Sequence, residues 1–336
     1  MHRVFAVIVS SVVGALALSG AHAQEVAEAE ITGDLIETCP ARGVIAEFEV
    51  SEVRENGLVG NYFAPAADGP RPALLVLGGS EGGLGGATQL GYWFASHGYA
   101  VLSLAYFGTE DLPNQLENIP LEYFRAGVDW LAAQEGVDSE RLGVYGISKG
   151  GEAALLIASR DERLRAVGAG VPSHAAWQSI NTSNFFATRS SWTKNGEPVP
   201  FQTYALNFNF TNIRGFYEGV FEGRSAVPEA VIPVEAINGP VLVISGGQDR
   251  IWPSDRMSEL VLERLGAEDF THAATHLHYA DAGHEAAFPL RLESVENLAD
   301  PSAAGGSAAA NAAARLDMWP RLSCFFDAAL NDGVAP

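Results

Sequence analysis

The sequence predicts an α/β protein in which a mostly parallel sheet is covered by helices on both faces and preceded by an antiparallel hairpin. First, short apolar segments alternate with segments of helical spacing from residue 73 onward, the pattern of parallel strands connected by helices. Second, two alternating segments flank Glu-Asn-Gly at residues 55–57, which favours a hairpin. Third, 47% of the residues are hydrophobic and 18% are charged, enough for one large core.

The individual elements follow from these patterns. The hairpin is predicted at residues 44–50 and 58–63. Later strands are predicted at residues 73–77, 100–104, 142–145, 166–170, 241–244 and 277–280, and helices at residues 88–96, 121–133, 150–159, 254–265 and 319–330. The stretch at residues 300–314 is rich in Gly, Ala and Ser and is expected to be a flexible loop before the last helix.

Residues 1–23 are interpreted as a signal peptide. Arg3 precedes an apolar run at residues 4–19, and Ala21-His22-Ala23 is a small-x-small cleavage pattern. We therefore expect an exported protein, periplasmic or secreted; an uncleaved anchor is the alternative, although the run is short for a membrane span. Residues 24–68 are predicted to form an arm and the hairpin, and residues 69–332 to form the catalytic domain.

Residues 172–238 interrupt the alternation of strands and helices. This stretch is long, rich in aromatic residues and weakly periodic. A long insertion at the carboxyl end of a sheet is typically a cap over a site, so we interpret it as a cap. The alternative is a packed excursion with no substrate role.

The formal net charge of −21 bears on possible partners. Such a surface repels nucleic acid and anionic membranes, and it does little to attract polyanionic substrates. The two cysteines, Cys39 and Cys324, could form a disulfide in an oxidising compartment. Two separate buried thiols are the alternative.

The candidate nucleophile is Ser148, within Gly-Ile-Ser-Lys-Gly at residues 146–150. This fits the G-x-S-x-G pattern, in which a strand turns sharply into a helix so that the hydroxyl projects above the sheet. The flanking glycines relieve the crowding that the turn creates. A predicted strand precedes the motif and a predicted helix follows it, so the context favours a nucleophile turn over a surface loop. This order of elements is that of the α/β-hydrolase fold.

A serine needs a base, and the base needs an acid to orient it. In this fold the chain order is Ser, then Asp or Glu, then His. Asp249 follows the strand predicted at residues 241–244, and His284 follows the one at residues 277–280. The carboxyl ends of parallel strands meet at one sheet edge, so Ser148, Asp249 and His284 are the predicted catalytic residues.

Other acids and histidines were weighed. Asp255 is interpreted as an early-turn acid of the following helix, and Asp281 is an alternative acid on the histidine's own loop. A group of three histidines could suggest a metal site: His272, His276 and His278. They lack the cysteine or carboxylate pattern of such a site, so we expect no metal there. His174 follows the strand after the nucleophile turn and could touch the pocket.

An oxyanion hole requires two backbone N–H groups. One is expected from Lys149, the residue after the nucleophile, and the other from Gly79 or Ser80 in the glycine-rich turn after residue 77. The turn lacks the Lys-Ser/Thr ending of a phosphate-binding loop. The side chains of Lys149 and Glu152 are one helical turn apart and are expected to pair.

The motifs resemble a known family, the acyl-CoA thioesterases and bile acid-CoA:amino acid N-acyltransferases. The similarity spans residues 69–330 and is carried by residues 104–107, 110–113, 121–124, 146–152, 247–249, 252–254, 283–284 and 288–289. The resemblance implies the α/β-hydrolase fold and puts the family's catalytic residues on Ser148, Asp249 and His284. Members that transfer acyl groups to amino acids often carry cysteine as nucleophile, so a serine favours hydrolysis.

The sequence therefore predicts a serine hydrolase that cleaves small-molecule acyl thioesters or esters through an acyl-enzyme, with no metal or organic cofactor. An exported carboxylesterase or peptidase without CoA substrates is one alternative. A non-catalytic binding protein on a hydrolase scaffold is another. The sequence leaves the oligomeric state open.

Overall fold

The computed structural model describes residues 31–32, 46–66, 69–184, 188–204, 212–221, 226–289 and 301–331. The predicted signal peptide and Cys39 lie outside these residues. The strands are β1 (Ile31–Thr32), β2 (Phe48–Val53), β3 (Val59–Pro65), β4 (Arg71–Leu77), β5 (Ala100–Ala105), β6 (Ile119–Pro120), β7 (Val137–Ile147), β8 (Leu164–Gly170), β9 (Trp192–Lys194), β10 (Glu197–Pro198), β11 (Val241–Gly246) and β12 (Ala274–Tyr279).

The α-helices are α1 (Gly85–Ser96), α2 (Leu121–Ala132), α3 (Lys149–Ala158), α4 (Gly215–Phe221), α5 (Ser254–Ala267), α6 (Pro301–Ala304) and α7 (Ala308–Leu330). Short 3-10 helices are η1 (Pro228–Ala230), η2 (Val234–Ala236) and η3 (His284–Ala287). In the part of the chain that the structure describes, no helix is both long enough and apolar enough to span a membrane.

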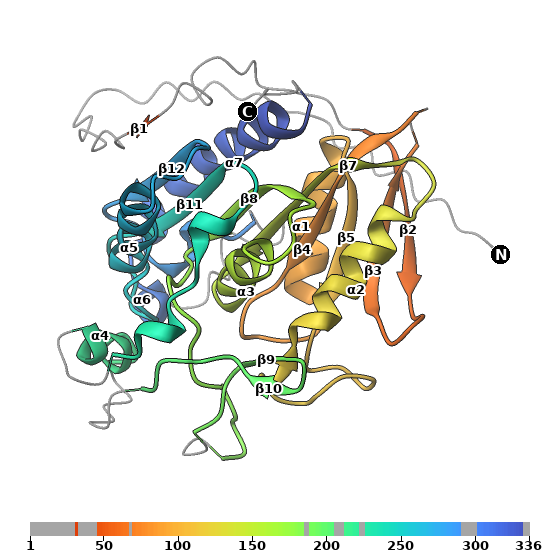
Figure 1. Cartoon of the computed structure of the whole chain (residues 1–336). Helices are drawn as coiled ribbons and strands as arrows, with labels where there is room; N and C mark the ends of the chain where they lie inside the picture. Colours follow the sequence, from red (N-terminus) through yellow and green to blue (C-terminus); the bar gives the residue numbers. More distant parts are fainter. Residues whose placement is uncertain are drawn as a thin grey trace, which may run out of the picture.

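One nine-stranded sheet, in the order β1-β12-β11-β8-β7-β4-β5-β3-β2, forms the centre of the molecule (Figure 1). The strands from β12 to β5 are parallel, and β3, β2 and β1 join the edges antiparallel. The sequence prediction of a mostly parallel sheet with an antiparallel hairpin is confirmed. The first hairpin strand begins at Phe48, later than predicted, and Val50 pairs with Phe63.

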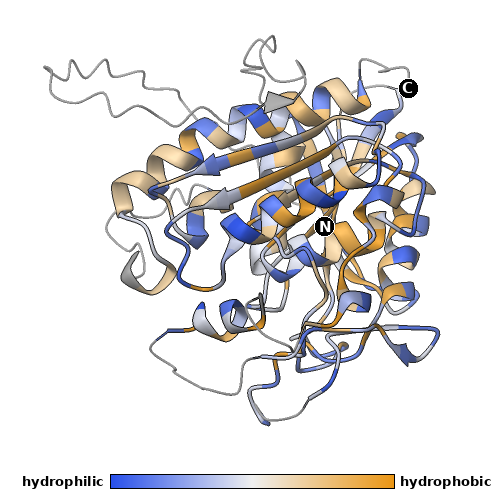
Figure 2. Cartoon of the chain, turned by 60° about the vertical axis from the view of Figure 1, so that its left-hand side comes forward, coloured by the Kyte–Doolittle hydropathy of each residue, from blue (hydrophilic) through white to orange (hydrophobic). Residues whose placement is uncertain are grey.

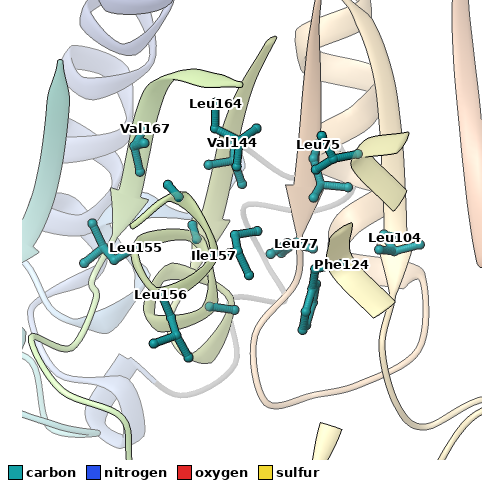
Figure 3. Packing of buried hydrophobic residues seen from close by; sticks show 14 of the residues in the cluster. Leu75, Leu77, Leu104, Phe124, Val144, Leu155, Leu156, Ile157, Leu164 and Val167 are labelled. Atoms are coloured by element: carbon teal, nitrogen blue, oxygen red, sulfur yellow. The ribbon is translucent and has the colours of Figure 1, made fainter. Parts of the chain in front are cut away.

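Two apolar layers hold the helices to the sheet, because successive strand residues point to opposite faces. On β4, Leu75 and Leu77 belong to the layer under α2, α3 and α5 (Figure 3), whereas Leu74 and Val76 belong to the layer under α1 and α7. Each fully buried side chain of this kind contributes about 1.5–3 kcal/mol. Figure 2 shows hydrophobic residues concentrated in the strands, whereas the helices carry both hydrophilic and hydrophobic residues along their length.

The expectation of a flexible loop at residues 300–314 is wrong for the described part of that stretch. Residues 301–304 form α6, and α7 begins at Ala308 rather than at residue 319. Alanine has the highest helix propensity, and the Ser307 hydroxyl caps the helix by accepting from the Ala310 N–H at 3.1 Å. The two elements are separated by Gly305 and Gly306, at φ values of +84° and +67°.

The predicted insertion, residues 172–238, lies between β8 and β11 and contains β9, β10, α4, η1 and η2. It adds a small second sheet, in which β9 pairs with β6. In Figure 1, β9, β10 and α4 lie beyond the ends of the central strands, whereas η2 packs against α3 and α5. Within the described residues, an aromatic cluster joins the insertion to the loop after β11: Trp177, Tyr204, Phe216, Tyr217, Val220, Trp252 and Met257.

Candidate active site

Ser148 occupies the sharp turn between β7 and α3. Its backbone has φ 56° and ψ −120°, a conformation that a side-chain-bearing residue adopts only under constraint. Glycine is required at positions 146 and 150, because neighbouring backbone atoms leave no room for a side chain there. A Cβ on Gly146 would lie 2.0 Å from the carbonyl oxygen of Gly150, and one on Gly150 would lie 2.2 Å from that of Gly78. The G-x-S-x-G pattern therefore reflects backbone crowding at this turn.

His284 bridges the serine and a carboxylate. Its Nε2 lies 3.0 Å from Ser148 Oγ, and its Nδ1 lies 2.8 Å from Asp249 Oδ2. All three side chains are buried, with exposed fractions of 5% for Ser148, 1% for Asp249 and 6% for His284. The structure thus brings together the three residues that the sequence singled out, each after its own strand.

Asp249 is held by a full set of donors. Its Oδ1 accepts from the N–H groups of Ile251 and Trp252, and its Oδ2 accepts from the Ser254 hydroxyl at 2.6 Å. These three hydrogen bonds fix the direction in which the carboxylate faces His284. The sequence does not predict the contact of Ser254 with Asp249, because it depends on how the turn after β11 folds back.

The segment between α6 and α7 also supports the site. Gly305 forms an isolated β-bridge with Asp249. Asn311 of α7 accepts a hydrogen bond from the Gly283 N–H at 2.7 Å and donates one to the Gly305 oxygen at 3.1 Å. Gly283 directly precedes His284 and Gly305 bridges to Asp249, so Asn311 links the histidine loop to the acid loop through Gly305. No local signal in the sequence indicates this role.

The candidate oxyanion donors lie beside Ser148. Lys149 is the first residue of α3, where a backbone N–H has no partner within the helix. A Cβ on Gly79 would be 3.2 Å from Ser148 Cβ, so the turn after β4 is close to the hydroxyl. Ser80 follows it and is exposed.

Glu81 changes the choice between Gly79 and Ser80. The Gly79 N–H already donates to Glu81 Oε1 at 3.0 Å, so it could serve an oxyanion only after that carboxylate moves away. Glu81 itself is exposed. Tyr106 also holds this turn: its buried hydroxyl donates to the backbone oxygens of Gly78 and Gly79. Burial, with the charge of Glu81, raises the pKa of Tyr106 well above its ordinary value.

The predicted pairing of Lys149 with Glu152 is confirmed. The Lys149 Nζ lies 2.7 Å from Oε1 and 2.8 Å from Oε2 of Glu152. The side chains are 2% and 0% exposed. Burial lowers the pKa of Lys149 and raises the pKa of Glu152, and the attraction between the two opposes both changes.

The competing acids lie elsewhere. Asp255 forms an ion pair with Arg214 at 3.2 Å, and Asp281 is exposed. Arg214 itself comes from the insertion, and it also donates to the backbone oxygen of Asp249 at 3.0 Å.

The other candidate histidines come from β12, the segment before it and the segment after β8. His276 and His278 of β12 both contact the Ser245 hydroxyl, at 2.7 and 3.0 Å, and His272 precedes β12. His174 is buried, and burial, with the charge of Arg256, lowers its pKa to about 4. Among the described residues, no group of three or more His, Cys, Asp or Glu side chains could hold a metal ion.

Cys324 is buried within α7. Its predicted partner Cys39 lies outside the described residues, so the pairing of these two cysteines stays a prediction.

A mostly parallel sheet, a nucleophile turn after β7, and an acid and a histidine at the ends of β11 and β12 define the class of α/β-hydrolase-fold proteins. The chain belongs to the BAAT / Acyl-CoA thioester hydrolase C terminal family, whose model matches residues 119–332. Among solved structures, it is similar to a puromycin-hydrolyzing peptidase of Mycobacterium tuberculosis, with a TM-score of 0.54 and 13% identity over 87% of this chain and 40% of that one. It is likewise similar to the 2,6-dihydroxy-pseudo-oxynicotine hydrolase, with a TM-score of 0.50 and 18% identity over 87% of this chain and 70% of that one. These likenesses concern the fold alone.

Curated relatives are acyl-CoA thioesterases by name. The chain is 29% identical to acyl-coenzyme A thioesterase 1 of Homo sapiens over 298 residues, 84% of this chain and 66% of that protein. It is 28% identical to the peroxisomal succinyl-coenzyme A thioesterase of Mus musculus over 286 residues, 82% and 64% of the two chains. The chain thus spans slightly less than two thirds of the length of these relatives.

Proposed function

We propose that this protein is a serine hydrolase that cleaves acyl thioesters or esters through an acyl-enzyme intermediate. The observation that carries the proposal is the hydrogen-bonded series Ser148 Oγ, His284 and Asp249, with separations of 3.0 and 2.8 Å in a buried site. An ordinary serine is a weak nucleophile, and such a series is the arrangement that activates it.

The reaction follows from these contacts. With the Nδ1 proton held by Asp249, His284 Nε2 accepts the proton of Ser148 as its oxygen attacks the acyl carbonyl. The Lys149 N–H, together with that of Gly79 or Ser80, stabilises the tetrahedral oxyanion. The leaving thiol or alcohol takes the proton from His284. Water, activated by the same imidazole, then hydrolyses the acyl-enzyme and regenerates the Ser148 hydroxyl.

The substrate class is drawn from the family and from the surroundings of the imidazole. Its named relatives are acyl-CoA thioesterases. Trp252 and Phe288 lie 6.1 and 5.9 Å from the ring of His284, and Trp252 belongs to the aromatic cluster of the insertion. Such surroundings suit an apolar acyl chain.

One observation favours a second candidate, an exported carboxylesterase or peptidase that does not use CoA thioesters. The net charge of −21 opposes the approach of a polyphosphate such as CoA. Rates on matched acyl esters, acyl-CoA thioesters and peptide amides, measured at low and high salt, separate the two.

We propose that the protein is exported after cleavage near Ala23. The N-terminal sequence and the location of the mature protein test this proposal.

The central test is Ser148→Ala. We expect turnover of a p-nitrophenyl acyl ester to fall about 10⁴-fold or more, because the nucleophile is removed, while the melting temperature changes little. The wild-type protein is expected to be labelled by a fluorophosphonate probe and the variant is not. Unchanged turnover in the variant, or a wild-type protein that neither reacts with the probe nor hydrolyses any acyl substrate, contradicts the proposal; the second result favours a binding protein.

A further inference from the structure

One carboxylate behind the nucleophile joins the insertion to the catalytic domain. Glu152 lies in the first turn of α3 and is fully buried. Its Oε1 accepts hydrogen bonds from Lys149 Nζ at 2.7 Å, from the Trp192 indole N–H at 2.7 Å and from the Trp177 backbone N–H at 3.1 Å. A single oxygen therefore collects one donor from the nucleophile turn and two from the insertion.

This carboxylate depends on the insertion for its stability. A buried charge is costly unless hydrogen bonds and an opposite charge replace its water. Both Trp177 and Trp192 are 0% exposed, so their N–H groups rather than water satisfy this oxygen. Undocking the insertion would leave Glu152 with Lys149 alone. The ion pair and the docked insertion consequently stabilise each other.

Lys149 is constrained on two sides by the same contacts. Its ammonium group contacts Glu152 and also lies 5.3 Å from the centre of the Trp192 ring, a cation–π distance. Because its backbone N–H is a proposed oxyanion donor, any rotation of this residue would misalign the donor with the oxyanion. A small misplacement of such a group costs transition-state stabilisation rather than substrate affinity.

We propose that Glu152 is a positioning residue whose Oε1 couples docking of the insertion to alignment of the Lys149 N–H beside Ser148. The inference rests on the proposed serine hydrolase function. In this arrangement the docked insertion helps to make the oxyanion hole competent.

Two double variants separate the acceptor from the charge. Lys149→Met with Glu152→Gln removes both charges but keeps an amide oxygen for Trp177 and Trp192. Lys149→Met with Glu152→Leu removes the charges and the acceptor at similar side-chain volume. Each is assayed as the full mature chain on a p-nitrophenyl acyl ester, with kcat expressed per site titrated to completion by a fluorophosphonate, so that misfolded protein does not count.

We expect the Gln double variant to lose less kcat than the Leu double variant, because it keeps an acceptor for the donors of Trp177 and Trp192. We expect the Leu double variant to lose about tenfold or more in kcat, with KM changed by less than about threefold. A purely structural role would lower the melting temperature of the Leu variant and leave kcat per titrated site unchanged, which would overturn the proposal. Equal losses in both variants would also overturn it, because charge rather than the acceptor would then be responsible.

Trp192→Phe is the second test, and it decides the matter if the Leu variant does not fold. It removes one donor to Oε1 and keeps an aromatic ring beside Lys149, and we expect kcat to fall about fivefold with KM nearly constant. Trp130→Phe removes an indole hydrogen bond to Glu55 on the outside of α2 and is the matched control. A kcat equal in the two variants contradicts the inference. An inactive, unlabelled wild-type protein would instead refute the proposed function on which it rests.

Discussion

At Ser148 the backbone is held at a positive φ that costs of the order of 1–3 kcal/mol for a residue with a side chain. The surrounding structure imposes it. The backbone N–H of Ser148 donates to the backbone oxygen of Gly170 at 2.8 Å, and the backbone oxygen of Ser148 accepts from the backbone N–H of Glu152 at 3.0 Å. The backbone of Ser148 is therefore held by one bond within α3 and one to β8, and this fixes the point from which the hydroxyl reaches His284.

A carboxylate beside the same turn works against the proposed chemistry. Glu81 Oε2 and Ser148 Cβ lie 2.8 and 3.2 Å from the position of a Cβ on Gly79, so the negative charge of Glu81 stands near the developing oxyanion. It also occupies the Gly79 N–H. Both effects disfavour the transition state.

Glu81→Gln is expected to raise kcat/KM for an uncharged acyl ester by about threefold. The amide keeps the size of the side chain but removes a charge that, in contact with water and several ångströms away, is worth on the order of 1 kcal/mol or less. Initial rates at low and high salt measure the effect, which should shrink as salt screens the charge in the wild type. A lower kcat/KM in the variant would show that Glu81 assists the reaction.

At the scale of elements, α7 supports the histidine loop from outside the sheet. Asn311 is 2% exposed and its amide makes one hydrogen bond to each side, to Gly283 and to Gly305. Arg315, one turn further along α7, donates to the backbone oxygen of Glu285 at 2.8 Å. The position of His284 thus depends on an element that follows it in the chain.

Asn311→Ala is expected to destabilise the fold by about 1–3 kcal/mol, because it leaves the buried Gly283 N–H without its acceptor. We also expect kcat to fall about tenfold, since the loop that carries His284 is loosened. Urea unfolding and ester kinetics measure the two effects. Asn331→Ala, at the C-cap of the same helix, is the control and should leave kcat unchanged. Wild-type kcat in the Asn311 variant would argue against a role for α7 in placing the base.

At the scale of the whole molecule, a buried histidine, His174, and a half-buried one, His276, link stability to pH. The pKa of His276 is lowered to about 4, first by burial and then by the neighbouring His278, and the pKa of His174 is lowered to about 4 in the same way by burial. In the unfolded chain both return to the ordinary value near 6.5. Between pH 6.5 and pH 4 the unfolded state therefore binds more protons than the folded state.

The free energy of unfolding should consequently fall as the pH is lowered through that window, by up to about 3 kcal/mol for each histidine. Urea unfolding at pH 7, 6, 5 and 4.5 measures the slope. The variant His276→Gln keeps a polar group beside Ser245, but glutamine does not titrate. The slope of its unfolding free energy against pH should therefore be smaller than that of the wild type by about the contribution of one histidine. An identical slope in the variant would mean that His276 is not protonated on unfolding in this range.

Much of this architecture was predictable because it depends on short stretches of chain. The period of apolar residues indicated the parallel strands and their helices, and Gly-x-Ser-x-Gly between a strand and a helix indicated the turn at Ser148. The order of strands along the chain indicated that Asp249 and His284 would reach the same sheet edge. The family resemblance was borne out by the match over residues 119–332.

Other features depend on contacts between distant segments, which no local pattern encodes. Only the folded chain decides that Glu81 takes the Gly79 N–H and that Asn311 holds the loop before His284. The stretch at residues 301–314 looked flexible because glycine and serine dominate its first half, yet Gly305 fits against Gln248 so closely that a Cβ there would lie 1.8 Å from its oxygen. The amino-acid pattern alone determined the elements and the chemistry available to them. Tertiary packing decided which groups meet, because hydrogen bonds depend on distances that only the closed fold defines.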